Sequence, residues 1–369
     1  MAADAVVARD HARLVHLVEA RLGRRVVRAE AMAAGLGTRR FHRLFLDDEA
    51  TLVARLEDDG TVAPRATAWP DAPAWHAEPP LEPLRGFLEE AGLPVPRSAL
   101  HLADEGLDLL EDVGRTNLLT VAPDVRRART LEACALLPAL QALDAPPERV
   151  PAFGRHYDAS LIATKAWKWL HWTIPMLLGR AATPDEAHGI ETLFDAIQAL
   201  AADAPRRLAH RDFKAENLHL VPGDTPEARL VMIDVQGAFL APPEYDLACL
   251  LYDLQVGHDE AFVREALDRT RSSLPDAPDE ATFRARFDAL ALARLCKDVS
   301  HVVHAGLARG DRRRWPEIPR GLALIERISG RRTHTLPGLR ALTSVTAALT
   351  AALQAADSGR RGRAGESER

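Results

Sequence analysis

The sequence predicts a two-lobed α+β protein with a small strand-rich N-terminal part and a larger, mostly helical C-terminal part. Three short runs of β-type residues lie near the N-terminus, at positions 26–32, 41–46 and 51–56. From about position 125 the chain changes to long stretches rich in Ala and Leu with helical periodicity. One β-type island interrupts them, at positions 218–221 and 230–233. A strand-rich part joined to a helical part is the outline of such a fold.

The composition excludes several classes of protein. The 369 residues include 47 Lys and Arg against 53 Asp and Glu, which gives a formal net charge of −6. The hydrophobic fraction of 47% and the charged fraction of 27% are close to globular averages and exclude wholesale disorder. The mildly acidic balance offers no overall basic surface to nucleic acid, and no apolar run reaches the roughly 18–20 residues of a membrane-spanning helix. We therefore expect two or three domains, with neither nucleic acid nor a membrane as partner.

Cysteine usage points to a reducing compartment. The three cysteines, Cys134, Cys249 and Cys296, are far apart in the sequence and form no CxxC pair. This excludes a disulfide scaffold and a typical zinc site. Residues 1–23 are charged throughout and lack the apolar core of a signal peptide, so we expect a cytoplasmic protein.

The N-terminal part is expected to hold one leading helix and one lobe. Apolar residues recur at helical spacing from Val7 to Leu22, so residues 1–25 are assigned to the leading helix. The lobe covers residues 26–114. Beyond the first three strands, it is expected to contain a short helix at positions 84–91, followed by two apolar runs around positions 100–102 and 107–110.

The C-terminal part is expected to form a helical lobe over residues 115–356. Its helices are predicted at positions 125–143, 153–178, 184–201 and, as a helical region, 245–356. The polar, Gly-rich segment 357–369 is predicted to be a disordered tail.

The strongest signal of chemistry is the stretch His210-Arg211-Asp212-Phe213-Lys214-Ala215-Glu216-Asn217. It matches the catalytic-loop pattern H-R-D-x-x-x-x-N of kinases, and Asn is so scarce here that a chance match is improbable. Asp234 follows 17 residues after Asn217, at the end of an apolar strand whose rigidity would fix its carboxylate. The competing interpretation is a capped turn whose polar side chains only satisfy backbone groups, and Asp234 makes that interpretation weaker.

These residue types fit the transfer of a phosphoryl group from ATP. The reaction needs positioning and charge neutralisation more than covalent chemistry. Asp212 would accept a hydrogen bond from the acceptor hydroxyl and take its proton, and Lys214 would balance phosphate charge. Mg²⁺ prefers oxygen ligands together with water and phosphate, which suits Asn217 and Asp234.

The strand-rich lobe should then bind the nucleotide. Gly35, Gly37 and Thr38 lie between two strands, where backbone N–H groups could approach phosphates, although an ordinary hairpin explains them as well. Arg55 stands near the place of the lysine in a V-A-x-K strand and could bind phosphates or simply face solvent. The candidates for its acidic partner are Glu78 and Glu82, which precede the short helix, and the spacing of neither from Arg55 is compelling. Finally, backbone groups of Glu111 and Val113 would meet the adenine edge.

Together these residues resemble the aminoglycoside phosphotransferase family of kinase-like enzymes, over about residues 26–256. The resemblance implies a bilobal protein-kinase-like fold, ATP and Mg²⁺ as cofactors, and Asp246 as a structural acid that holds the catalytic loop. Residues 233–248 look more particularly like the anomeric sugar kinases of bacterial cell-wall recycling, which phosphorylate N-acetylmuramate and N-acetylglucosamine at C1. In this chain Val235 and Gly237 replace an aromatic residue and a second acid of that subgroup.

The acceptor is expected to bind near the metal acid and on the helices before His210. Gln236 lies next to the metal acid, and Asp158 and His171 could hydrogen-bond the hydroxyls of a sugar. Three of the six tryptophans fall at positions 167, 169 and 172, where a sugar-binding role competes with simple core packing.

The sequence therefore predicts an ATP- and Mg²⁺-dependent kinase of a small-molecule hydroxyl, most simply a sugar or amino sugar. An aminoglycoside or choline-like acceptor stays open, because Asp158, Asp253, Asp259 and Glu260 could face a polycation. A catalytically inactive nucleotide-binding module is the alternative outside the enzyme class. A protein kinase fits poorly, because only eleven residues separate Asp234 from Asp246 and leave no room for an activation loop.

Overall fold

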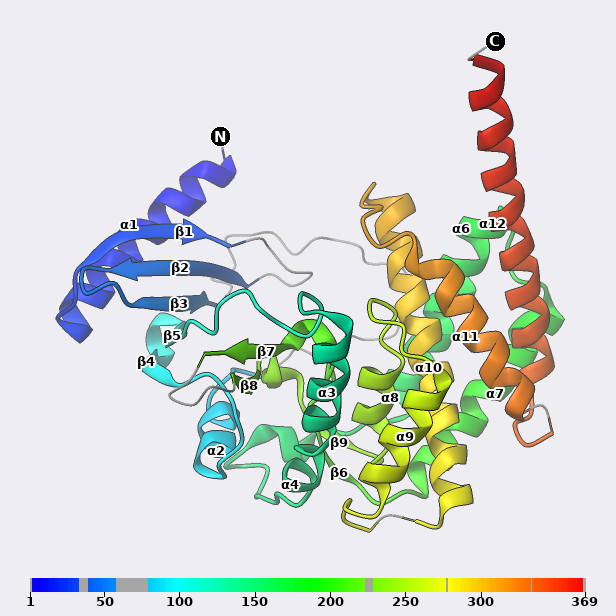
Figure 1. Ribbon diagram of the computed structural model, residues 1–369, viewed down its shortest axis with the longest axis horizontal. Helices are drawn as coiled ribbons and strands as arrows, with labels where there is room; N and C mark the ends of the chain where they lie inside the picture. Colours follow the sequence, from blue (N-terminus) through cyan, green and yellow to red (C-terminus); the bar gives the residue numbers. More distant parts are fainter. Residues whose placement is uncertain are drawn as a thin grey trace. The chain divides into compact units, whose positions relative to one another are not determined.

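The computed structural model describes residues 2–32, 39–57, 79–222, 228–276, 278–332 and 334–367 (Figure 1). Gly35, Gly37 and Thr38 lie outside the described residues, so the phosphate-binding prediction for them stays a prediction. The described chain divides into two compact units. The first combines the N-terminal residues with Leu81–Thr116 and His219–Ile233, and the second combines Asn117–Leu218 with the residues from Asp234 onward.

An antiparallel five-stranded sheet forms the centre of the first unit. In chain order its strands are β1 (Val26–Ala31), β2 (Arg40–Leu46), β3 (Thr51–Leu56), β4 (Ser98–Leu102) and β5 (Leu107–Glu111). The spatial order is β1-β2-β3-β5-β4, so β3 and β5 are neighbours although 50 residues separate the end of β3 from the start of β5. The three expected strands are present, and the two apolar runs around positions 100–102 and 107–110 form β4 and β5.

The leading helix belongs to this first unit. Helix α1 (Ala2–Leu22) buries Leu14 and Val18 in one hydrophobic cluster with Leu44, Ala54 and Leu109 of the sheet. Alternate strand residues point to one face of a sheet, which is why these apolar positions meet the apolar stripe of the helix. The short helix α2 (Leu84–Glu90) also lies in this unit.

The β-type island forms a hairpin-like pair rather than part of the helical unit. Strands β7 (Leu218–Val221) and β8 (Arg229–Met232) pair with each other. Backbone hydrogen bonds join them to the first unit, from Leu220 N to Thr116 O at 2.9 Å and from Met232 N to Pro94 O at 2.8 Å. The division along the chain thus differs from the expected boundary at residue 115, because the island returns to the strand-rich unit.

The second unit is mostly helical. Its helices are α3 (Pro123–Cys134), α4 (Leu137–Gln141), α5 (Ala159–Lys168), α6 (Ile174–Leu178), α7 (Pro184–Ala202), α8 (Tyr245–Leu251), α9 (Glu260–Arg271), α10 (Glu280–Ala308), α11 (Glu317–Arg332) and α12 (Leu339–Ser367). Two short strands, β6 (Arg207–Ala209) and β9 (Phe239–Ala241), pair in an antiparallel manner and were missed because three residues are too few for a periodic pattern.

Two predicted helices are divided by local chemistry. The stretch 125–143 forms α3 and α4 with a break between them. In the stretch 153–178, helix α5 starts only after Asp158, whose carboxylate accepts a hydrogen bond from Leu161 N at 3.0 Å and caps the helix. A π-helical segment, η3 (Trp169–Thr173), then separates α5 from α6.

The prediction of a disordered tail is not what the structure shows. Helix α12 continues to Ser367, so the backbone of most of the segment 357–369 is helical. The Ala-rich run that precedes it supplies a long preformed helix, and adding a turn to an existing helix is far easier than nucleating one. No helix among the described residues is long and apolar enough to cross a membrane.

Candidate active site

A buried carboxylate fixes the start of the motif that contains Asp212. Strand β6 ends at Ala209, and the next two backbone N–H groups, of His210 and Arg211, donate to the carboxylate of Asp246 at 2.7 and 3.1 Å. Asp246 lies on α8 and is 1% exposed. Its burial raises its pKa to about 7, against the lowering effect of the two N–H donors. Asp246 therefore holds the loop, as the resemblance implied.

Further hydrogen bonds set the rest of the loop. Asp253 accepts one from Ala215 N at 3.0 Å. The side-chain amide of Asn217 donates to the backbone oxygen of Asp212 at 2.9 Å. Because this bond uses the nitrogen of the amide, the Asn217 side-chain oxygen remains as the atom that can ligate a cation. The only other asparagine in the chain, Asn117, donates to Glu216 O at 3.2 Å.

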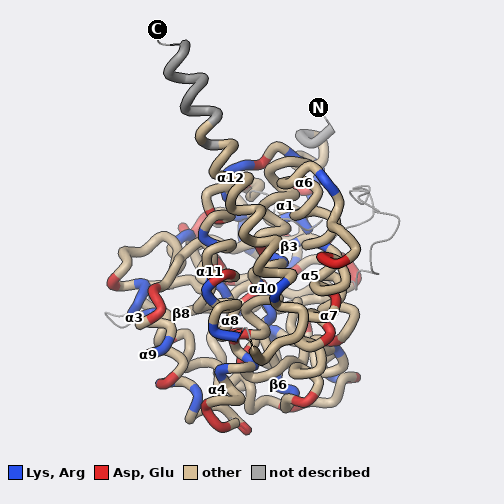
Figure 2. Tube along the Cα trace, turned by 90° about the vertical axis from the view of Figure 1, so that its right-hand side faces the viewer, with Lys and Arg blue, Asp and Glu red and all other residues tan. Residues whose placement is uncertain are grey.

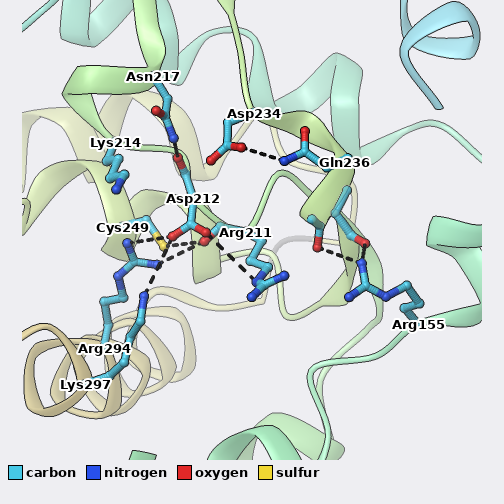
Figure 3. Close-up of polar contacts among 12 residues, drawn as sticks. Arg155, Arg211, Asp212, Lys214, Asn217, Asp234, Gln236, Cys249, Arg294 and Lys297 are labelled. Atoms are coloured by element: carbon cyan, nitrogen blue, oxygen red, sulfur yellow. Dashed lines mark hydrogen bonds and ion pairs between the residues drawn. The ribbon is translucent and has the colours of Figure 1, made fainter. Parts of the chain in front are cut away.

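Asp234 is presented by a sharp turn directly after β8. Its backbone is left-handed, with φ of 65°, a conformation that Asp tolerates better than most residues. Gln236 donates from Nε2 to one Asp234 carboxylate oxygen at 2.6 Å. Arg155 holds the following residues by donating to the backbone oxygens of Gly237 and Ala238, both at 3.0 Å. Figure 3 shows the Asp234 side chain directed toward the side of the loop that carries Asp212 and Asn217.

Two cations from α10 contact the carboxylate of Asp212. Arg294 Nη2 lies 3.1 Å and Lys297 Nζ lies 3.8 Å from its Oδ1 (Figure 3). Burial alone would raise the pKa of the Asp212 carboxyl, but Lys297 and Arg294 outweigh it and hold that pKa well below the usual range. Asp212 is therefore ionised at neutral pH. Its side chain is 24% exposed, so it can still meet a ligand.

Lys214 also lies beside Asp212. It pairs with Glu216, and although burial lowers its pKa, Asp212 and Glu216 together raise it above the usual value. The ammonium of Lys214 is therefore charged.

Arg55 has a different acidic partner from those considered. It stands opposite Asp108 in the β3–β5 pair and donates from Nη1 to that carboxylate at 2.6 Å. Its Nη2 donates to Glu57, also at 2.6 Å. Glu82 instead pairs with Arg85, and Glu78 lies outside the described residues. The acidic partner of Arg55 is determined by which residues of β3 and β5 face each other, and this register cannot be read from the sequence.

The segment after β5 is shaped by Asp112. Its carboxylate accepts from Arg43 at 2.6 and 3.0 Å and from Gly114 N at 3.0 Å. The backbone N–H of Glu111 donates to Arg97 O at 2.8 Å. Among the described residues, the backbone of Val113 takes part in no backbone–backbone hydrogen bond, and the residue is 8% exposed.

The three acceptor candidates have separate environments. Asp158 caps α5, as described above. His171 is exposed on η3, and its ring stacks on Trp167 with centroids 4.8 Å apart. Gln236 is buried against Asp234. Trp169 is fully buried and Trp172 stacks on His304 at 4.2 Å, so these two tryptophans belong to the core.

The donor set fits Mg²⁺ that is shared with phosphate. Asn217 and Asp234 offer an amide oxygen and a carboxylate, which are hard ligands of the kind that Mg²⁺ prefers. Within the described residues no group of three or more His, Cys, Asp or Glu side chains forms a metal cage. Two protein ligands with the remainder from phosphate and water is the usual arrangement for nucleotide-bound Mg²⁺.

Sequence reasoning missed Arg294 and Lys297, yet one signal was available. Only four of the 47 Lys and Arg residues are lysine, namely Lys165, Lys168, Lys214 and Lys297. Electrostatic coupling links each of these lysines to another, and Lys214 and Lys297 couple directly to Asp212. Two of the four lysines therefore lie beside this carboxylate, together with Arg294 and Arg211.

Similarity to known proteins agrees with this geometry. The family model described as phosphotransferase enzyme family matches residues 28–286. The N-acetylmuramate/N-acetylglucosamine kinase of Pseudomonas aeruginosa is 28% identical over 269 residues, which cover 69% of this chain and 76% of that protein. The kinase of the same name from Neisseria meningitidis is 28% identical over 66% of this chain and 73% of its own length.

Solved structures show the same kinase-like fold. Choline kinase LicA from Streptococcus pneumoniae aligns with a TM-score of 0.58 and 14% identity, over 86% of this chain and 98% of that one. Two structural features agree with the family match, which covers more than two thirds of the sequence. They are the loop held by Asp246 and the oxygen ligands beside it. The chain belongs to the phosphotransferase enzyme family.

Proposed function

We propose that this phosphotransferase uses ATP and Mg²⁺ to phosphorylate a hydroxyl of an N-acetylated amino sugar, at C1. One observation carries the reaction class, namely the placement of three residues. Asp212 and Asn217 lie on one hydrogen-bonded loop, and Asp234 lies on the turn after β8. The amino-sugar acceptor rests on the relatives, whose names specify N-acetylmuramate and N-acetylglucosamine.

Asp212 is the catalytic residue in this mechanism. Its ionised carboxylate accepts a hydrogen bond from the acceptor hydroxyl and orients the oxygen toward the γ-phosphorus. A bond forms between that oxygen and phosphorus while the bond from phosphorus to the β,γ-bridging oxygen breaks, and Asp212 takes the proton. A low pKa is compatible with this role, because the proton moves late in a loose phosphoryl-transfer transition state.

Other residues of the second unit position the reacting groups. Arg294 and Lys297 hold the Asp212 carboxylate in place, and Lys214 offers a charge to the transferred phosphoryl group. Asn217 and Asp234 would hold Mg²⁺, with Gln236 orienting Asp234. When bound, Mg²⁺ neutralises charge on the phosphates.

Residues of the first unit would bind the nucleotide. The backbone groups of Val113 and Glu111 would meet the edge of adenine. Arg55 is anchored to the buried Asp108, whereas its second partner, Glu57, is 35% exposed. We infer that Arg55 keeps Asp108 and exchanges Glu57 for phosphate, with Gly35, Gly37 and Thr38 completing the contact.

The charge around Asp212 argues against a polycationic acceptor. The acids that might have faced an aminoglycoside are engaged elsewhere: Asp158 caps α5 and Asp253 holds Ala215. Asp259 caps α9, and Glu260 pairs with two arginines. An aminoglycoside or choline would instead meet the cations of α10. We therefore rank such acceptors second.

A screen of ADP release tests the proposal. The panel contains N-acetylmuramate, N-acetylglucosamine, glucose, kanamycin and choline, each with ATP and Mg²⁺. We expect turnover with an N-acetyl sugar and its loss in Asp234→Ala, whereas the exposed control Glu191→Gln keeps it. Turnover with kanamycin or choline and none with a sugar would overturn the acceptor. If the protein releases ADP with none of these acceptors, the result would support an inactive nucleotide-binding module.

A further inference from the structure

One carboxylate on α10 contacts both of the α10 cations that contact Asp212. Asp298 Oδ2 accepts a hydrogen bond from Arg294 Nε at 2.9 Å, and Asp298 Oδ1 lies 3.4 Å from Lys297 Nζ. Arg294 and Lys297 in turn lie 3.1 and 3.8 Å from Asp212 Oδ1. The two cations therefore lie between two acids. Asp212 belongs to the catalytic-loop motif, whereas Asp298 comes from a distant helix.

The three nitrogens of the Arg294 guanidinium contact three different groups. Nε donates to Asp298 at 2.9 Å, Nη1 donates to the backbone oxygen of Arg211 at 3.0 Å, and Nη2 lies 3.1 Å from Asp212. A guanidinium is planar and rigid, so contacts at Nε and Nη1 determine where Nη2 points. Asp298 thus helps to fix the direction from which Arg294 meets Asp212, as the orientation of Arg294 in Figure 3 illustrates.

Helix α10 gives this arrangement a rigid base. Arg294 and Asp298 are four residues apart, so their side chains lie on the same face of the helix, one turn from each other. The helix contacts α5, α8 and α11, and Figure 2 shows these helices around it. Arg294 is 4% exposed and the side chain of Asp298 is 18% exposed. A largely buried arginine on a packed helix has few conformations open to it, and its charged partners select among them.

Asp298 is ionised at neutral pH. Burial alone would raise the pKa of its carboxyl, but Arg294 and Lys297 outweigh burial and hold that pKa below its usual range. Hydrogen bonds between ionised groups are shorter and stronger than those between neutral groups. The charge also divides the attraction of each cation between two carboxylates, so Arg294 and Lys297 hold Asp212 without belonging to it alone.

We propose that Asp298 is a positioning residue of phosphoryl transfer, which acts through Arg294 and Lys297 to keep the Asp212 carboxylate directed at the acceptor hydroxyl. The inference rests on the proposed function for the role of Asp212 itself. Asp298 contacts neither sugar nor nucleotide in this scheme and takes no proton. Its removal should therefore slow the chemical step and leave the binding of both substrates as it is.

Asp298→Asn removes the charge and keeps the size of the side chain. With N-acetylglucosamine as acceptor, kcat should fall about tenfold, because a displacement of 1 Å at a reacting group can cost about a hundredfold. The KM values for the sugar and for ATP should stay unchanged, since the lost interaction stabilises only the transition state. Asp298→Glu keeps a carboxylate and should recover part of kcat. A raised KM for the sugar at unchanged kcat would make Asp298 an acceptor-binding residue and overturn the inference.

A matched control lies on the same helix. Asp288 is 4% exposed and also holds two cations, Arg331 at 2.9 Å and Arg332 at 2.8 Å. Asp288→Asn should lower the melting temperature, as Asp298→Asn does, but leave kcat unchanged. An equal fall of kcat in both variants would indicate general damage to α10 and would refute a positioning role.

A double variant tests the route by which Asp298 acts. Arg294→Met already removes the guanidinium, so adding Asp298→Asn should reduce kcat by a smaller factor than Asp298→Asn does in the wild-type protein. Equal factors in the two backgrounds would mean that Asp298 acts independently of Arg294, which contradicts the inference.

A further measurement does not depend on turnover. In crystal structures of the wild-type protein and Asp298→Asn, Arg294 Nη2 should lie farther from Asp212 Oδ1 in the variant. An unmoved Arg294 would refute the inference even where the protein phosphorylates the sugar. If the wild-type protein phosphorylates no acceptor, the proposed function fails, while a displaced Arg294 would still show that Asp298 positions it.

Discussion

Buried charges are arranged differently in the two units of the molecule. In the first unit, Arg40 pairs with Asp10, Arg43 with Asp112 and Arg55 with Asp108, each with a contact of 2.6 Å. In the second unit, Asp212 shares its cations with a second acid, because Arg294 and Lys297 both contact Asp212 and Asp298. A paired arginine is a structural element, because its planar fork matches a carboxylate. The Asp212 carboxylate differs from those paired acids because its side chain is 24% exposed and can still meet a ligand.

The largest contrast should appear between Asp212, which is partly exposed, and Asp10, which is buried. Asp212→Asn should reduce kcat by about a thousandfold or more, because positioning and proton acceptance are both lost. Asp10→Asn, in the first unit, should lower the melting temperature and leave kcat nearly unchanged, because Asp10 pairs with Arg40 and Arg9 and lies close to His42. Steady-state kinetics with thermal unfolding checks both. Equal kcat in Asp212→Asn and the wild type would remove Asp212 from the mechanism.

Breaking a balanced pair should destabilise the first unit strongly. Arg55→Met leaves Asp108 without its guanidinium, and removal of one partner of a buried pair typically costs about 3–5 kcal/mol. The double variant Arg55→Met/Asp108→Leu should recover part of that loss in the free energy of unfolding measured in urea. If the double variant is no more stable than the single variant, the pair is not the source of the effect.

Weakening the cationic environment of Asp212 should change the pH profile. Arg294→Met should lower kcat about tenfold to a hundredfold, because the carboxylate loses its nearest anchor. The pKa of Asp212 should rise toward its ordinary value, since Arg294 lowers it in the folded protein. The variant should therefore lose proportionally more activity at pH 5 than at pH 8. A uniform loss at both values would contradict the electrostatic role.

The smallest effect concerns the stability of the empty protein. The pKa of Lys168 is about 7 in the folded state and near 10.5 when unfolded, so the folded state binds fewer protons between these values. Stability attributable to this lysine should then rise as the pH increases from 7 to 9. Lys168→Met should show a smaller rise in melting temperature over that interval than the exposed control Arg264→Met. Identical slopes would indicate that Lys168 stays charged.

The sequence predicted what is local. The H-R-D-x-x-x-x-N motif, the strand before Asp234 and the first three strands of the first sheet all depend on residues close together in the chain. The family and the phosphotransferase activity followed from these motifs and agree with the known relatives.

Contacts between distant segments were not predictable from periodicity. Arg294 lies 82 residues beyond Asp212, and only the packing of α10 against the loop brings them together. Likewise the Arg55–Asp108 contact depends on β3 pairing with β5 rather than with β4. The restriction of lysine to four positions was visible in the sequence, but only the structure shows that Lys214 and Lys297 lie beside Asp212.

A competition reaction tests the central claim most directly. Equal concentrations of N-acetylmuramate, N-acetylglucosamine and kanamycin are incubated together with the wild-type protein, ATP and Mg²⁺, and the phosphorylated products are quantified by mass spectrometry. We expect the phosphates of the N-acetyl sugars to predominate and phosphorylated kanamycin to be absent. Predominance of phosphorylated kanamycin would contradict the proposed amino-sugar acceptor.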